Sequence, residues 1–300
     1  RLDIRHLQMI RALGRTGRVV DAADTLGLTP SALSHRIKEA ERRLGVPLFE
    51  RSSKGVKLTE AGELMREHAQ HVRDEQTYLL DQIGHYQDGR SQIVRIATGE
   101  GFASDLMENG LLALTRDHPH LRFIIDHAGT DELQRRVIEG QCDIGIAYNP
   151  LMTEATRSLA HSRQSLCGLV PSHSPLAGRS SVTLAEMLEQ PVAMLNAGYA
   201  IRHLVGQAAA DRGLALRVQV ETASISLLLR YVCAGVGVSF LPRFSATNQA
   251  ERGDLAILDI EETSLQQVST HLMVRARRRL PKSVALVASF LSEHMLAFRD

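Results

Sequence analysis

The chain has 300 residues, of which 44% are hydrophobic and 23% are charged, so its composition is that of a water-soluble protein with two or three domains. No apolar run is long enough to span a bilayer, and the N-terminal segment lacks the apolar core of a signal peptide. We therefore expect a cytoplasmic protein, with the reservation that the sequence begins at Arg1.

The net charge of +1 is unevenly distributed along the chain. Residues 1–58 contain 12 Lys and Arg against 6 Asp and Glu, whereas the remainder contains 23 against 28. A basic N-terminal head on an acidic body predicts that the head binds a polyanion.

The head begins with a pattern of three short helices. Apolar residues at three-residue steps from Leu7 to Leu13 predict the first, and residues 19–26 predict a second that stops near Gly27. Thr29 is suited to cap a third helix, which starts at Pro30 and ends at Gly45. Two helices joined by a short glycine-containing turn are typical of a helix-turn-helix.

The third helix combines hydroxyl and cationic side chains on the face opposite Leu33, Ile37 and Ala40, as a helix in the DNA major groove would. Strand-like residues 48–51 and 56–58 flank a turn at 52–55, which predicts a wing that follows the phosphate backbone. A helical hairpin with a solvated polar face is the alternative. The predicted DNA-binding residues are Thr29, Ser31, Ser34, His35, Arg36, Lys38, Arg51, Lys54 and Lys57.

The stretch AADTLGLTPSALSHRIKEAERRLGVPLFERSSKGVKLTEAGE resembles the DNA-binding head of the LysR-type transcriptional regulators. Members often carry glutamine where Pro30 stands and proline where Ser31 stands, so base choice is expected to shift to Ser31, Ser34, His35 and Arg36. The residues that carry the resemblance are Ala22-Ala23, Ser31-Ala32-Leu33-Ser34, Glu41, Leu44-Gly45, Leu48-Phe49, Arg51, Leu58-Thr59 and Ala61-Gly62.

A long helix is predicted to follow Thr59, with Met65, Val72, Leu79 and Tyr86 repeating every seven residues. The stripe favours pairing with a partner helix, and packing on the helix's own chain is the alternative. The resemblance implies a dimer through this linker helix, and residues 88–92 are the expected hinge.

The rest of the chain alternates strands and helices, which predicts a mostly parallel sheet covered on both faces. The expected strands are 93–97, 121–126, 143–148, 166–170, 191–195, 216–220, 236–241 and 268–274, and the expected helices are 104–116, 131–139, 201–212, 224–234 and 282–295. Two such series resemble the two-lobed periplasmic-binding-protein fold, which LysR-type effector domains have. We expect a winged helix-turn-helix at 1–58, a linker at 59–90 and an effector domain at 91–300. Its first lobe would comprise 93–163 and 269–300, and its second 164–268.

Ligands of open α/β sheets bind beyond the carboxyl ends of the strands, so the polar loops there predict a cleft between the lobes. A small organic anion held by amides, hydroxyls and Arg202 is the expected effector, whereas Glu100 would favour a cationic group, as in an amino acid or a quaternary amine. Caps and turns without ligand contact are the alternative. The predicted cleft residues are Thr98, Gly99, Glu100, Gly101, Phe102, Gly129, Thr130, Tyr148, Asn149, Asn196, Gly198, Tyr199, Arg202 and Ser224.

Motifs of nucleotide-binding and hydrolytic enzymes are missing, so neither catalysis nor a cofactor is predicted. The cysteines Cys142, Cys167 and Cys233 have no metal-binding spacing; we interpret them as buried thiols, with a redox-sensing pair as the alternative. The predicted function is sequence-specific transcriptional regulation modulated by a small organic or amino acid. The expected partners are promoter DNA, the effector and copies of the chain as dimers or tetramers, with RNA polymerase as a further candidate. An α/β enzyme with a helical N-terminal domain and a solute-binding protein for transport are the alternatives.

Overall fold

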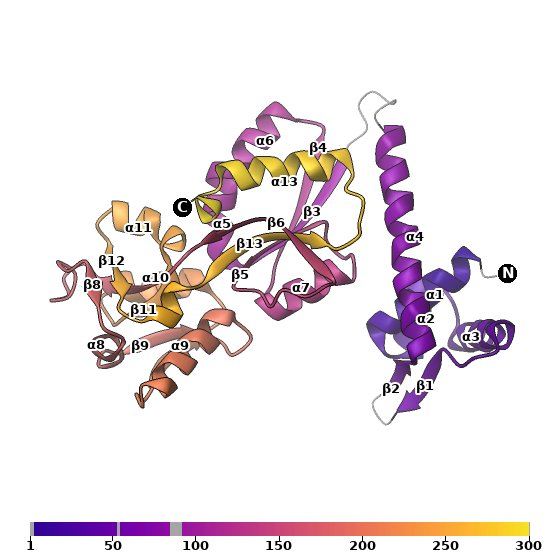
Figure 1. Cartoon of the computed structure of the whole chain (residues 1–300), viewed down its shortest axis with the longest axis horizontal. Helices are drawn as coiled ribbons and strands as arrows, with labels where there is room; N and C mark the ends of the chain where they lie inside the picture. Colours follow the sequence, from indigo (N-terminus) through magenta and orange to yellow (C-terminus); the bar gives the residue numbers. More distant parts are fainter. Residues whose placement is uncertain (1–2, 53–54, 85–91, 300) are drawn as a thin grey trace. The chain divides into compact units, whose positions relative to one another are not determined.

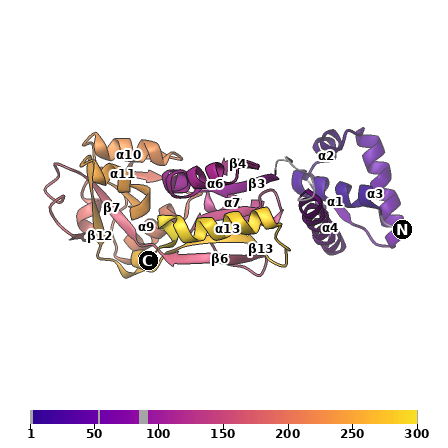
Figure 2. The same ribbon diagram turned by 90° about the horizontal axis from the view of Figure 1, so that it is seen from above.

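The computed structural model describes residues 3–52, 55–84 and 92–299. The chain divides into two compact units, Arg1–Leu80 and Asp81–Asp300. The unit boundary lies inside the linker helix, so the first part of that helix belongs structurally to the head. Figure 1 and Figure 2 give two views of the elements of each unit.

The head has the winged helix-turn-helix architecture expected from the sequence. The side-chain oxygen of Thr29 accepts the Ala32 backbone N–H at 3.2 Å and fixes the start of α3. Gly27 and Gly45 end α2 and α3 in the left-handed conformation, with φ of +63° and +73°. The elements are α1 (Ile4–Thr16), α2 (Val19–Leu26), α3 (Pro30–Leu44), β1 (Phe49–Ser52), β2 (Gly55–Leu58) and α4 (Glu60–Gly84).

The core of the head lies where α1, α2, α3 and the start of α4 meet. Ala22 and Ala23 are completely buried, and their small side chains let α2 pack closely on its neighbours. The other buried apolar residues of this core are Met9, Ile10, Ala12, Leu13, Leu33, Ala40, Leu48, Met65 and Ala69.

The wing is an antiparallel pair, β1 with β2, that is bonded to the helices on two sides. The Glu41 carboxylate of α3 accepts the backbone N–H groups of Leu48 and Phe49 at 2.9 and 3.2 Å. The N–H of Val56 donates to the carbonyl of Gly17, in the turn after α1, at 2.8 Å. These bonds hold the wing against α3 and against the turn after α1.

The predicted apolar stripe of the linker helix α4 is buried near the start of the helix and exposed further along it. Its N-terminus is capped by Thr59, whose hydroxyl accepts the Gly62 N–H at 3.0 Å and donates to the Pro47 carbonyl at 2.7 Å. Met65 packs into the core of the head, whereas Leu79 is 57% exposed. Tyr86, the last residue of the predicted stripe, lies outside the described residues.

The first lobe of the body is built on a mixed sheet with the order β4-β3-β5-β13-β6. Strand β13 returns from the far end of the chain and pairs antiparallel with both β5 and β6. Helices α6 and α13 cover one face of this sheet and α7 covers the other (Figure 1). The elements are β3 (Gln92–Thr98), α5 (Ala103–Leu106), α6 (Leu112–Asp117), β4 (Leu121–His127), α7 (Thr130–Ile138), β5 (Ile144–Tyr148), β6 (Thr156–Arg163), β13 (Ser269–Arg275) and α13 (Lys282–His294).

The second lobe contains a four-stranded sheet, β11-β7-β12-β8, and a parallel pair, β9 with β10. The sequence did not predict β6, β8 or β12, and the strand expected at 236–241 is the shorter β11. The elements are β7 (Leu166–Pro171), β8 (Ser181–Val182), α8 (Leu184–Leu188), β9 (Val192–Leu195), α9 (Ala200–Asp211), β10 (Val218–Thr222), α10 (Ile225–Cys233), β11 (Ser239–Pro242), α11 (Thr247–Glu251), β12 (Leu255–Ile260) and α12 (Thr263–Gln266).

The helix expected at 104–116 is interrupted by a π-helical turn at Met107–Leu111. Gly110 lies in this turn against Leu291 of α13, where a Cβ would come within 2.5 Å of the leucine side chain. Among the helices of the described ranges, none combines the length and the apolar character needed to cross a bilayer.

Replacing Gly62 by alanine tests the close approach of α4 to the wing. A Cβ at this position would lie 2.1 Å from the carbonyl oxygen of Leu48. Helix propensity alone favours alanine by about 1 kcal/mol. Overpacking against backbone costs about 1–3 kcal/mol, so we expect a net loss of stability in the head. Faster hydrogen–deuterium exchange over residues 48–62 of the full chain would measure it.

The matched control is Gly178→Ala, because a Cβ on Gly178 meets no atom within 4 Å. Exchange in the head should be unchanged in that variant. Equal exchange at 48–62 in the wild type and in Gly62→Ala would contradict the proposed packing.

Candidate functional site

Helix α3 presents one polar stripe to solvent. Leu33 and Ala40 are buried on its inner side. Ser31, His35, Lys38 and Arg42 are exposed at spacings of four, three and four residues, so they lie along one outer face. Arg42 is not among the sequence-predicted residues, although its spacing of seven from His35 would have indicated it.

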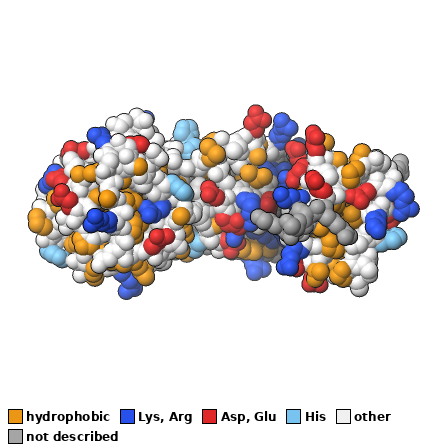
Figure 3. Space-filling model, turned by 90° about the horizontal axis from the view of Figure 1, so that it is seen from below, with side chains coloured by type: hydrophobic (Ala, Val, Ile, Leu, Met, Phe, Trp, Pro, Cys, Tyr) orange, Lys and Arg blue, Asp and Glu red, His pale blue; other side chains and the backbone are white. Residues whose placement is uncertain are grey.

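The acidic residues of α3 bond to groups outside this stripe. Glu39 pairs with Arg43, and the Glu41 carboxylate is turned toward the wing. In Figure 3, acidic side chains lie among the Lys and Arg side chains that are visible. The ordered stripe on α3 is therefore a more specific feature of the head than its charge excess.

The remaining predicted DNA-binding residues lie at the helix start, on α3 and in the wing. Thr29 caps α3, and its hydroxyl lies 3.1 Å from that of Ser31. Ser34 and Arg36 are half-buried, and Lys57 on β2 is exposed. Two predictions fall on parts that are not described: the side chain of Arg51, whose backbone is in β1, and the whole of Lys54.

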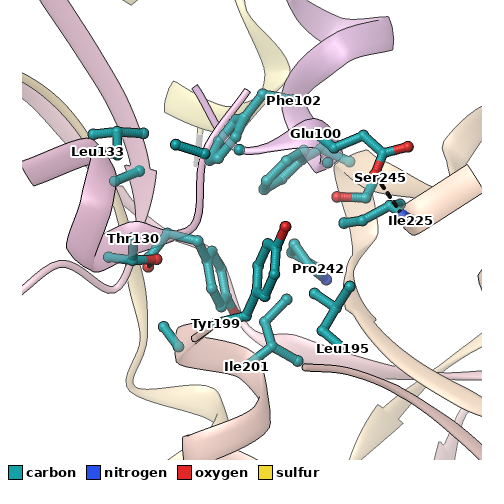
Figure 4. A pocket seen from close by; sticks show the side chains of 17 residues that line it. Glu100, Phe102, Thr130, Leu133, Leu195, Tyr199, Ile201, Ile225, Pro242 and Ser245 are labelled. Atoms are coloured by element: carbon teal, nitrogen blue, oxygen red, sulfur yellow. Dashed lines mark hydrogen bonds between the residues drawn. The ribbon is translucent and has the colours of Figure 1, made fainter. Parts of the chain in front are cut away.

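A second candidate site is a pocket between the two lobes of the body, with about 450 Å³ of space not filled by atoms when the open solvent at its mouth is included. Figure 4 shows it surrounded by the loop after β3, the start of α7, the ends of β9 and β11 and the start of α9. Its lining residues are Gly99, Glu100, Gly101, Phe102, Ala128, Thr130, Leu133, Ala147, Tyr148, Leu195, Tyr199, Ala200, Ile201, Ile225, Pro242, Phe244 and Ser245.

The predicted cleft residues divide into two groups. Gly99, Glu100, Gly101, Phe102, Thr130, Tyr148 and Tyr199 line the pocket. The others do not belong to its lining: Thr98, Gly129, Asn149, Asn196, Gly198, Arg202 and Ser224.

The surroundings of three predicted residues show why they do not line the pocket. Thr98 is completely buried, and its hydroxyl bonds to the Gly99 carbonyl at 3.3 Å. The guanidinium of Arg202 extends along its own helix toward Gly206. At Gly129 a Cβ would come within 2.8 Å of the Gly198 carbonyl, so the loops of the two lobes touch there.

Sequence reasoning missed most of the apolar lining because it searched for polar groups at strand ends. Pro242 is the last residue of β11 and Phe244 and Ser245 follow it, so the strand-end rule applied to this strand would have found them. The full set of missed residues is Ala128, Leu133, Ala147, Leu195, Ala200, Ile201, Ile225, Pro242, Phe244 and Ser245.

Aromatic side chains form much of the pocket wall. The rings of Phe102 and Phe244 stack across the lobes, with centroids 4.8 Å apart and planes at 25°. The Tyr148 hydroxyl donates to the Gln164 carbonyl at 2.7 Å, and the Tyr199 hydroxyl donates to the Ala223 carbonyl at 3.2 Å. Burial raises the pKa of Tyr148 well above its usual value, and burial and the Glu100 charge raise the pKa of Tyr199. Both phenols are therefore neutral and already bonded.

Glu100 connects the two lobes at one side of the pocket. Its carboxylate accepts the Ile225 N–H at 2.7 Å, the Ser224 hydroxyl at 3.2 Å and the Ser226 N–H at 3.3 Å. The negative charge therefore sits on the positive end of α10, where free N–H groups and the helix dipole stabilise it. From the sequence, the Glu100 carboxylate was expected to favour a cationic effector, but this carboxylate is already hydrogen-bonded within the protein.

Ser245 is the polar side chain of the wall that is left without a partner. It is 8% exposed, and its hydroxyl makes no hydrogen bond to any residue that the structure describes. A buried hydroxyl without a partner costs free energy, so the hydrogen-bonding capacity of this shielded oxygen is unused within the described residues.

The cysteines do not have the properties of reactive thiols. Burial raises the pKa of Cys142 to about 12 and that of Cys167 to about 11, so both thiols stay protonated near neutral pH. Burial also raises the pKa of Cys233. Within 3–52, 55–84 and 92–299, no group of three or more His, Cys, Asp or Glu side chains could hold a metal ion.

Two family models match the chain: "Bacterial regulatory helix-turn-helix protein, lysR family" over residues 4–63 and "LysR substrate binding domain" over residues 87–296. The activator CmpR of Synechocystis is 22% identical over 298 residues, covering 98% of this chain and 95% of CmpR. The regulator CbbR of Sinorhizobium medicae is 27% identical, covering 89% of this chain and 85% of CbbR.

Solved structures share the fold of the chain. A full-length OxyR variant from Pseudomonas aeruginosa has a TM-score of 0.72 at 21% identity, covering 99% of this chain and 97% of the other. Full-length CbnR in complex with its target DNA has a TM-score of 0.57 at 19% identity, covering 97% and 99%. With the two family models, this establishes that the chain belongs to the LysR family of bacterial transcriptional regulators, which are DNA-binding proteins with an effector-binding domain and not enzymes.

Proposed function

We propose that the chain regulates transcription by placing α3 in the major groove of promoter DNA while a small molecule in the interlobe pocket adjusts this binding. The observation that carries the proposal is the exposed stripe of Ser31, His35, Lys38 and Arg42 on a helix whose opposite side is buried. Such a helix presents hydrogen-bonding groups to base edges while the fold holds its orientation.

The two parts of the head have different tasks in this proposal. Ser31, Ser34, His35 and Arg36 reach base edges and supply sequence preference. Lys38, Arg51, Lys54 and Lys57 neutralise phosphates and supply salt-dependent affinity. The bonds of Glu41 to the backbone of Leu48 and Phe49 hold the start of the wing against α3. A regulator of this kind acts where the bacterial chromosome lies, in the cytoplasm.

Self-association through α4 completes the proposed DNA-binding assembly. Leu79, Leu80 and Ile83 are 57%, 58% and 42% exposed on this helix. Three neighbouring exposed aliphatic side chains on a long helix favour pairing with a second copy. A dimer presents two heads to two half-sites about one helical turn apart, and pairing of dimers gives the proposed tetramer. Contact with RNA polymerase stays a prediction.

The pocket supplies the regulatory input because both lobes contribute to its wall. A ligand that contacts both lobes favours one relative orientation of the lobes over another. It shifts the equilibrium only by its difference in affinity for the two orientations. We propose that this shift changes the DNA footprint of the assembled heads.

Substitutions in the head test the DNA-binding proposal. Lys57→Ala should weaken binding to all duplex sequences alike and lower the slope of log affinity against log salt by about 1, because one phosphate contact is lost. His35→Ala should instead reduce the preference for a cognate promoter over random duplex, by about 1–3 kcal/mol. Fluorescence anisotropy across a salt series measures both quantities.

Arg252→Ala is the control, because it removes the same charge from an exposed position in the second lobe. The head proposal fails if Lys57→Ala and Arg252→Ala change the salt slope equally. It also fails if wild-type protein binds no duplex in a salt-dependent way.

Charged substitutions on α4 test self-association. The double variant Leu79→Glu, Leu80→Glu should shift the protein toward monomers. The substitutions remove the apolar contact between paired helices, and the new carboxylates of the two copies repel each other. Analytical ultracentrifugation measures the change. Leu151→Glu, at a 77% exposed position in the body, should leave the mass unchanged. An unaltered mass in the α4 variant would place the interface elsewhere.

A further inference from the structure

The interlobe pocket is poor in charge for a site expected to hold an anion. Among its described lining residues, Glu100 alone carries a charge, and it is negative. Arg202, the expected anion partner, does not belong to the lining. Aliphatic and aromatic side chains such as Leu133, Leu195 and Ile201 surround the cavity (Figure 4).

The position most suited to an anion is already filled by the protein. The first turn of α10 directs the N–H groups of Ile225 and Ser226 toward the neighbouring lobe, and the Glu100 carboxylate accepts both. A ligand carboxylate at this place would have to displace Glu100, and elsewhere in the pocket it would lie near the Glu100 charge without a cationic partner. Both alternatives are costly in an apolar cavity.

We propose that the effector is an uncharged, largely apolar organic molecule, excluded from carrying a carboxylate by Glu100 and held through one hydrogen bond by Ser245. This inference rests on the proposed use of the pocket as the effector site.

Ser245 gives this proposal its polar contact. Its hydroxyl is buried and unpartnered among the described residues, whereas the lining tyrosine hydroxyls are bonded to backbone carbonyls. A Cβ on Gly101 would lie 2.9 Å from this hydroxyl, so the loop after β3 packs closely against the shielded oxygen, and a ligand reaches it by moving this part of the wall. One ligand carbonyl, hydroxyl or amide satisfies it. The stacked rings of Phe102 and Phe244 offer a flat apolar surface nearby.

The test uses the full chain and probes that differ in charge at one group. Phenylacetamide, phenylacetate and 2-phenylethylamine form one set; hexanamide, hexanoate and hexylamine form another. Isothermal titration calorimetry should give each amide at least about tenfold tighter binding than its carboxylate and its amine, a difference of about 1.4 kcal/mol.

Variants separate the two roles. Glu100→Ala vacates the start of α10, so the ratio of carboxylate affinity to amide affinity should rise by about tenfold or more. Glu100→Gln, which keeps the shape of the side chain, should relax the discrimination in part and serves if the alanine variant is unstable. Ser245→Ala should weaken amide binding by about threefold to tenfold through the lost hydrogen bond. Arg202→Ala is the control and should change none of these values.

Three results would overturn the inference: tighter binding of a carboxylate than of its amide by the wild type, tightest binding of an amine, or no binding of any probe at millimolar concentration. The salt dependence of duplex binding, measured on the same samples, keeps the proposals apart. A protein that binds duplex but prefers carboxylates loses only the inference about the effector. A protein without salt-dependent duplex binding loses the proposed function.

Discussion

The state of the effector domain depends on one carboxylate that serves a helix in the opposite lobe. Glu100 stands in the loop after β3, and the N–H groups that it accepts belong to the first turn of α10, about 125 residues further along the chain. Helix starts need acceptors, and a charged acceptor is among the strongest. Because Glu100 fills that need, the lobes are joined by an electrostatic bond as well as by the Phe102–Phe244 stack. The pocket between them is enclosed by contacts that a change in lobe orientation must break.

The head and the body obtain their functional surfaces in different ways. In the head, short-range bonds fix a helix whose outer residues are left for another molecule: Thr29 caps it and Glu41 joins it to the wing. In the body, the pocket arises only when segments from β3, α7, α9 and β11 are brought together. The functional residues of the head follow one another along a single helix, whereas those of the body come together only when the domain has folded.

This contrast explains how far the sequence could be interpreted. The ends of α2 and α3 were predictable because capping by Thr29 and the left-handed glycines 27 and 45 are local effects. The strand β12 was missed because burial along Leu255–Ile260 does not alternate, so the two-residue period that marks a half-buried strand is missing. Arg202 sits on a correctly predicted helix, yet which way it points depends on how that helix is rotated against its lobe. The partner of Glu100 could not be identified from spacing at all, since it lies in another lobe.

The outward face of α3 has a consequence for how such a regulator evolves. No hydrogen bond within the described residues ties the side chain of His35 or Lys38 to the rest of the head, and the contacts that hold the helix come from its other side, through Leu33 and Ala40. Exchanges at exposed positions of this kind alter stability by only about 0.5 kcal/mol. After gene duplication, a copy could therefore be redirected to a different operator by a few changes on this face, without compensating repairs in its core.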